Sequence, residues 1–137
     1  MAFQGNSICN AFKLAQWAGT VNFATDTFKI ALYTNAAELG EATAAYTSAG
    51  EVVAAGYTAG GAALVVSVQP TASGTVVYVS FADATFTAAL TARGALIYKD
   101  GGPAVCVLDF GADKTSTTVF TVQFPAATST SAILRLE

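Results

Sequence analysis

Apolar and polar side chains alternate most regularly in the segment DTFKIALYT, residues 26–34. Phe28, Ile30 and Leu32 fall on one side of an extended chain, and the residues between them fall on the other. A period of two residues is typical of a β-strand with one buried face. The segment therefore predicts a half-buried strand.

Similar short runs, rich in valine, threonine, phenylalanine and tyrosine, recur about every ten residues from residue 51 onward. Glycine, proline, aspartate and serine separate them, and Pro70 and Gly111 are expected to end two of the strands. The predicted strands are EVVAA (51–55), AALVVSVQ (62–69), TVVYVSFA (75–82), ATFTAALTA (84–92), RGALIYK (93–99), AVCVLDF (104–110), TVFTVQF (118–124) and SAILRLE (131–137). The pattern predicts an all-β fold, either an antiparallel β-sandwich or a jelly-roll-like barrel of about eight strands.

One short helix is predicted near the N-terminus, in NSICNAFKLAQWAG (6–19), with an N-cap at position 6 or 7 and a stop at Gly19. A helix of this length is marginal alone in water, so it must dock on something. It docks either on its own domain or, as an arm, on a neighbouring subunit. The predicted organisation is a single β-domain of residues 1–137, with a helical arm (1–19) and a β-sandwich (26–137).

Two segments lack a sustained period of either kind. Residues 35–50 read as a long loop, and GYTAGG (56–61) reads as a glycine-rich corner. Long loops in compact domains are often functional or form interfaces. We expect both segments to face a partner.

The composition is poor in charge: 11% of the residues are charged, whereas an ordinary domain has about 25%. The net charge is −3 and the six basic residues are scattered singly, which predicts no nucleic-acid partner. The longest uncharged run, 52–82, is broken by glycines and a proline, and the first ten residues show no secretory signal. No membrane partner is predicted, and the weakly charged surface indicates either a small, tightly folded protein or one that partners cover in an assembly.

Reactive side chains are few. The chain has no histidine, which removes the usual general base and the commonest metal ligand. It also lacks a Gly-x-Ser-x-Gly elbow, a GxxxxGK[ST] phosphate loop and a D-x-D-x-D calcium spacing. We therefore expect no catalytic residue, no cofactor and no metal, and a protein that is not an enzyme.

The remaining polar and sulfur side chains have structural interpretations. Asp109 interrupts an apolar strand, so we expect a structural ion pair with a cation on an adjacent strand, Arg93 or Lys99. Cys9 and Cys106 have no CxxC spacing and are expected to be small buried hydrophobes, with a disulfide between them as the alternative.

The five tyrosines, at positions 33, 46, 57, 78 and 98, have two interpretations. Their rings could form a platform for sugar binding. Because they are spread over separate strands and loops, we favour the interpretation that the rings fill the edges of the core and interfaces while the hydroxyls stay in contact with water.

Several motifs, in order, carry a resemblance to a known family: DTFKIALYT, GYTAGG, FADATFTAALTARGALIYKD, AVCVLDFGADKT and FTVQFPA, preceded by Phe12–Lys13. Over nearly its whole length the chain resembles small virion structural proteins of tailed bacteriophages. Some of these look like capsid cement or decoration proteins, which sit outside the head lattice, commonly as trimers, and hold major capsid subunits together. The resemblance implies a non-enzymatic protein on the capsid exterior, made in the host cytoplasm, with the major capsid protein and its own copies as partners.

Two other functions stay open. One is a tail or fibre component that binds a host surface glycan, and the other is a β-sandwich enzyme acting on carbohydrate through some of the nine acidic residues. For the favoured function, the residues predicted to lie at interfaces are Phe3, Ile8, Phe12, Trp17, Tyr46 and Tyr57.

Overall fold

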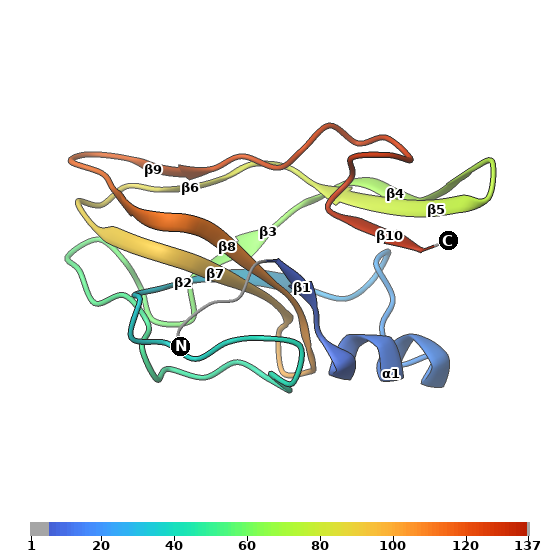
Figure 1. Cartoon of the computed structure of the whole chain (residues 1–137), viewed down its shortest axis with the longest axis horizontal. Coiled ribbons are helices and arrows are strands. Elements are labelled where there is room, and N and C mark those ends of the chain that lie inside the picture. Colours follow the sequence, from blue (N-terminus) through green and yellow to red (C-terminus); the bar gives the residue numbers. More distant parts are fainter. Residues whose placement is uncertain (1–5, 137) are drawn as a thin grey trace.

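The computed structural model describes residues 6–136, and antiparallel sheets account for most of their regular structure (Figure 1). The largest sheet has the strand order β1-β8-β7-β2-β3, formed by Ser7–Ile8, Ala104–Thr115, Thr91–Lys99, Phe28–Tyr33 and Ala62–Leu64. A three-stranded sheet has the order β10-β5-β4, formed by Leu134–Leu136, Val76–Phe81 and Val66–Ser73. β6 (Ala84–Phe86) pairs with β9 (Phe120–Val122), and the helix α1 spans Asn10–Ala18. The all-β prediction is confirmed, but the alternative of a closed barrel is wrong, because the described strands form separate sheets with open edges.

The β6–β9 pair lies over the five-stranded sheet, and β4, β5 and β10 continue this upper layer to the right, above α1 (Figure 1). Apolar side chains from both layers fill the space between them. They include Phe28 and Ile30 of β2, Ile97 of β7, Leu108 of β8, Phe81 of β5, Phe86 of β6, Val122 of β9 and Leu134 of β10. Burial of this apolar area is the main force that holds the layers together.

The central strand β2 is buried on both faces. Phe28, Ile30 and Leu32 point into the core between the layers, as the alternation predicts. Ala31 and Tyr33 on the opposite face are buried in a second apolar cluster, to which the loop that follows β2 contributes Ala37 and Leu39. The prediction of a half-buried strand is therefore wrong in one respect, because the loop covers the face expected to meet solvent.

The long loop 34–61 is held closely against the five-stranded sheet. Gly61 has a φ of +82°, and a Cβ atom built on it would lie 1.8 Å from the carbonyl oxygen of Ile30. Only a residue without a side chain permits this approach. The strand predicted at 51–55 is reduced to one bridge between Glu51 and Tyr33. Single backbone hydrogen bonds, such as that from the Ala104 N–H to the Ala44 carbonyl, tie the loop to the sheet in place of a continuous ladder.

Two predicted strand ends are also wrong. β4 continues through Pro70, where the pairing with β5 shifts register between Val68 and Thr71. A proline is tolerated there because β4 is an edge strand and the shift accommodates the missing N–H. β8 continues through Gly111, whose φ of +81° allows the backbone to bend without ending the strand.

The helix begins later than predicted. Residues Ser7–Ile8 pair with β8, so Cys9 instead of residue 6 or 7 occupies the N-cap position. Gly19 ends the helix in the left-handed conformation, as predicted. Phe12 is buried and its ring packs edge-on against Phe23, so the helix docks on its own chain. At nine residues, α1 falls well short of a membrane span, and no other helix in residues 6–136 reaches that length.

Candidate functional site

A cluster of hydroxyl groups surrounds the buried carboxylate of Glu51. The Tyr46 hydroxyl donates a hydrogen bond to Oε1, and the Tyr57 hydroxyl donates one to Oε2 at 2.6 Å. The backbone N–H of Gly60 also donates to Oε2, at 2.8 Å, while the Tyr98 hydroxyl donates to the Gly60 carbonyl. The buried carboxylate is thus surrounded by donors, as a buried charge requires.

The tyrosines of this cluster stay protonated at neutral pH. Burial, reinforced by the hydrogen bond to Glu51, raises the pKa of Tyr46 to about 12. Burial, reinforced by the Asp100 charge, raises the pKa of Tyr98 to about 12. The pKa of Tyr57 is raised further by burial and by its hydrogen bond to Glu51. The cluster therefore acts as a set of fixed donors that ties the loop to the sheet.

Four of the five tyrosines are used inside the chain. Tyr46, Tyr57 and Tyr98 belong to the Glu51 cluster, and the Tyr33 hydroxyl donates to the Thr47 carbonyl at 2.6 Å. The rings of Tyr46 and Tyr98 also stack on each other, with centroids 5.0 Å apart. These four rings fill the space between loop and sheet and do not form an open platform.

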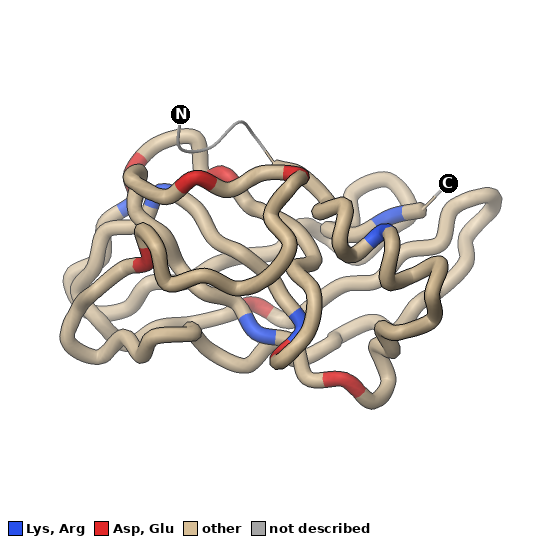
Figure 2. The backbone as a smooth tube through the Cα atoms, turned by 90° about the horizontal axis from the view of Figure 1, so that it is seen from below, with Lys and Arg blue, Asp and Glu red and all other residues tan. Residues whose placement is uncertain are grey.

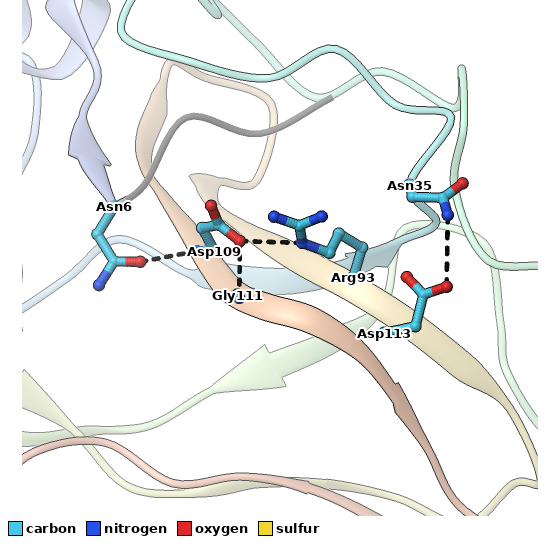
Figure 3. Close-up of polar contacts among 6 residues, drawn as sticks. All are labelled: Asn6, Asn35, Arg93, Asp109, Gly111 and Asp113. Atoms are coloured by element: carbon cyan, nitrogen blue, oxygen red, sulfur yellow. Dashed lines mark hydrogen bonds and ion pairs between the residues drawn. The ribbon is translucent and has the colours of Figure 1, made fainter. Parts of the chain in front are cut away.

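Arg93 and Asp109 form the predicted ion pair, with Arg93 Nε 3.1 Å from Asp109 Oδ1 (Figure 3). The same oxygen accepts a hydrogen bond from the backbone N–H of Gly111. The Asp109 N–H donates to the side chain of Asn6, which joins the start of the described chain to β8. The pair lies where the register of β7 against β8 shifts, so it stabilises an irregular part of the sheet.

Other acidic side chains also have structural partners. Asp83 accepts a hydrogen bond from the Phe124 N–H at 2.9 Å, and Asp113 accepts one from the Asn35 amide at 3.3 Å. Asp26 lies 3.2 Å from Lys99, and its pKa is lowered by the Asn22 N–H and by Lys99. Within residues 6–136, no three Cys, Asp or Glu side chains gather in a way that could hold a metal ion.

Both cysteines are free and buried, as the favoured interpretation predicted. The β1–β8 pairing places Ile8 opposite Cys106, and Cys9 is the next residue along the chain. Burial raises the pKa of the Cys9 thiol to about 11, and it raises that of Cys106 as well. Neither thiol is an activated nucleophile at neutral pH.

The six predicted interface residues have different environments. Phe3 lies outside the described residues. Phe12 is buried in the core of its own chain, so its ring is already covered, and Ile8 is partly buried beside it. Tyr46 and Tyr57 point toward Glu51. Trp17 is 92% exposed, which makes it the one of the five described residues that offers a large uncovered apolar surface.

An open groove of about 810 Å³ lies between α1 and β10. Its apolar lining is formed by Ile8, Phe12, Trp17, Ile133 and Leu136. Lys13 and Arg135 also line the groove, and no described Asp or Glu does. Figure 2 shows two neighbouring blue segments close to the C-terminus, in a chain whose charges are otherwise sparse.

Neither the Glu51 cluster nor the groove follows from the sequence pattern. Glu51 appears in the sequence only as one of nine acids, and its position six residues before Tyr57 matches no known motif. The groove is lined by residues from 8–17 and from 133–136, and no sequence pattern indicates that these two distant segments meet.

Comparison with known proteins gave no match: no family model fits the chain, and no curated protein or solved structure is similar to it.

Proposed function

We propose that this chain is a non-enzymatic structural protein of a tailed-phage virion, and specifically a capsid decoration protein that binds the outside of the head lattice. The ordered motifs from DTFKIALYT to FTVQFPA support the virion assignment through their resemblance to phage structural proteins. The major capsid protein and further copies of the chain, as a trimer, are the proposed partners. The proposed location is the capsid exterior, after synthesis in the host cytoplasm.

The single structural observation that supports an assembly role is the contrast between polar and apolar groups. Several carboxylates are used in internal contacts, among them those of Glu51, Asp109 and Asp83. Several large apolar side chains are exposed instead, among them Trp17 and Leu136. Exposed apolar surface beside a groove is typical of a protein–protein contact.

Such a protein would act by mass action. A ligand that binds an assembled shell, and not its separated subunits, stabilises the shell in proportion to the logarithm of its concentration over Kd. The low charge fraction suits this role, since few charges have to be desolvated when faces are covered.

The alternative, a tail or fibre component that binds a host glycan, was motivated by the tyrosines. Tyr33, Tyr46, Tyr57 and Tyr98 point into contacts between loop and sheet, which leaves Tyr78 as the one tyrosine outside them. The observation that motivated this alternative therefore no longer favours it.

Quantitative mass spectrometry of separated heads and tails tests the proposal. A head location, with copy numbers comparable to the major capsid protein, is expected. Shells that lack the protein should then disrupt at lower temperature, and adding purified protein should restore their stability. A few copies confined to the tail would overturn the proposal.

A further inference from the structure

The groove between α1 and β10 combines three features that together describe an occupant. It has an apolar floor, two cations and an edge strand. Each feature can be read from the described residues, and each restricts what the groove can bind.

The cations supply the charge preference. Three of the six basic residues are in ion pairs: Lys29 with Asp100, Arg93 with Asp109 and Lys99 with Asp26. The other three are Lys13, Lys114 and Arg135, and none of these has a carboxylate within ion-pair distance in residues 6–136. Two of the three therefore meet in one groove, on a protein whose net charge is −3.

Arg135 is also held in position. Its Nη1 donates to the Thr130 carbonyl at 2.7 Å. A guanidinium has five N–H donors, so this contact orients the group and leaves it able to bind a carboxylate.

The apolar floor and the exposed Trp17 supply the binding area. Trp17 is 92% exposed and Leu136 is 53% exposed, while Ile8 and Phe12 lie deeper between them and the core. An occupant that covers these side chains removes apolar surface from water, which is favourable. It must therefore carry apolar side chains as well as carboxylates.

The edge strand β10 offers backbone hydrogen-bonding groups to an occupant of the groove. β10 is the outermost strand in the order β10-β5-β4, so it pairs with β5 on one side only. An extended segment can add to such an edge through main-chain hydrogen bonds, and its successive side chains then point in turn to the face of Leu136 and to the face of Arg135.

A second copy of the chain does not offer such a segment in its described residues. The exposed acidic side chains are Glu38, Glu41, Asp83, Asp100 and Asp113. None of them lies within two residues of an exposed large apolar side chain. Leu39, which lies between Glu38 and Glu41 in the sequence, is buried. The charge and apolar pattern thus point to a different protein.

We infer that the groove between α1 and β10 binds an extended acidic segment of a partner protein, in which apolar residues alternate with carboxylates. The apolar side chains pack on Trp17, Ile8 and Leu136, and the carboxylates pair with Lys13 and Arg135. This inference concerns the groove alone, and it stands whether or not the partner belongs to a phage head.

Trp17 is the only tryptophan of the chain, so its fluorescence reports on the groove directly. The probe is a blocked octapeptide that alternates leucine and glutamate, titrated into the purified protein at low salt. We expect a saturable blue shift of the Trp17 emission, which weakens as salt is added. A matched peptide with lysine in place of glutamate should bind at least about tenfold more weakly.

Charge-reversed variants identify the cations. The double variant Lys13→Glu, Arg135→Glu should lose at least about tenfold in affinity for the acidic peptide and gain affinity for the lysine peptide. Lys114→Glu is the matched control, since Lys114 also has no ion pair with any residue in 6–136 and does not line the groove. If the double variant does not fold, chemical-shift changes at Ile8, Trp17 and Leu136 of the unaltered protein provide the same information.

Four results would overturn the inference. They are equal binding of the two peptides, an equal loss in Lys114→Glu, shifts that map away from the groove, and a dimer in sedimentation that Lys13→Glu, Arg135→Glu dissociates. None of these results depends on where the protein sits in a particle. Failure of the groove and failure of the decoration function are therefore distinguishable.

Discussion

The hydroxyl of Tyr57 lies 2.6 Å from Oε2 of Glu51 and 2.9 Å from the backbone nitrogen of Leu32. It donates a hydrogen bond to the carboxylate and accepts one from the N–H of the central strand β2. One side chain thereby joins the long loop to the middle of the five-stranded sheet. Loss of this hydroxyl leaves two buried polar groups each short of a partner.

Tyr57→Phe should therefore lower the free energy of unfolding by about 1.5–3 kcal/mol, because a hydrogen bond to a charged group is lost in a buried site. The matched control is Tyr78→Phe, whose hydroxyl has no hydrogen-bond partner among residues 6–136 and which should change stability by less than about 0.5 kcal/mol. Urea denaturation measures both. Equal effects of the two variants would show that the Tyr57 hydroxyl contributes nothing.

Gly61 tests how closely the loop approaches β2. Gly61→Ala places a Cβ atom 1.8 Å from the Ile30 carbonyl oxygen, so we expect a loss of at least about 3 kcal/mol, at the large end of single-substitution effects. Gly101→Ala is the control, since Gly101 has a similar φ of +74° but no atom within 4 Å of the built Cβ. It should lose only about 1–2 kcal/mol, the cost of the left-handed conformation.

Thermal and urea unfolding of the two glycine variants give the comparison. A loss in Gly61→Ala no larger than that in Gly101→Ala would mean that the loop is not held against Ile30.

The Arg93–Asp109 pair should contribute measurably to stability. Its side chains are 25% and 10% exposed, so solvent screens the pair only partly. A double-mutant cycle with Arg93→Met and Asp109→Asn should give a coupling energy of about 1 kcal/mol or more. The control cycle uses Lys29 and Asp100, which lie 3.9 Å apart and are 33% and 54% exposed, and it should give less than about 0.5 kcal/mol.

A coupling energy for Arg93 and Asp109 as small as that of the exposed pair would contradict a structural role at the register shift.

Alkaline pH should destabilise the fold in a defined range. Burial raises the pKa of the Cys9 thiol from 9.0 to about 11. Burial also raises the pKa values of Tyr46 and Tyr98 from 10.0 to about 12, reinforced by Glu51 at Tyr46 and by Asp100 at Tyr98. The unfolded state releases these protons first as pH rises. The stabilisation is therefore complete below pH 9 and is lost as pH rises through 11 and 12.

Urea denaturation between pH 8 and pH 12 measures this loss. The variant Cys9→Ala should lose less stability between pH 9 and pH 11, and it should retain the loss between pH 10 and pH 12 that comes from Tyr46 and Tyr98. Stability that stays constant from pH 8 to pH 12 in the unaltered protein would contradict the prediction.

Local pattern determined much of this protein. The period of two in residues 26–34 set which side chains of β2 share a face, since alternation follows from strand geometry alone. Gly19 ended the helix because a glycine readily takes the left-handed conformation there. A carboxylate within an apolar strand had to be compensated, so Asp109 predicted a nearby cation before its partner was known.

The tertiary structure decided everything that depends on segments far apart in the chain. The β7–β8 register, which places Gly94 opposite Asp109, selected Arg93 as the partner, while Lys99 pairs with Asp26. Only the packing of loop 34–61 buried the second face of β2 and surrounded Glu51 with tyrosines. Only the meeting of α1 with β10 brought Lys13 and Arg135 to the same groove. These contacts depend on chain closure over tens of residues, and no local period encodes which segments meet.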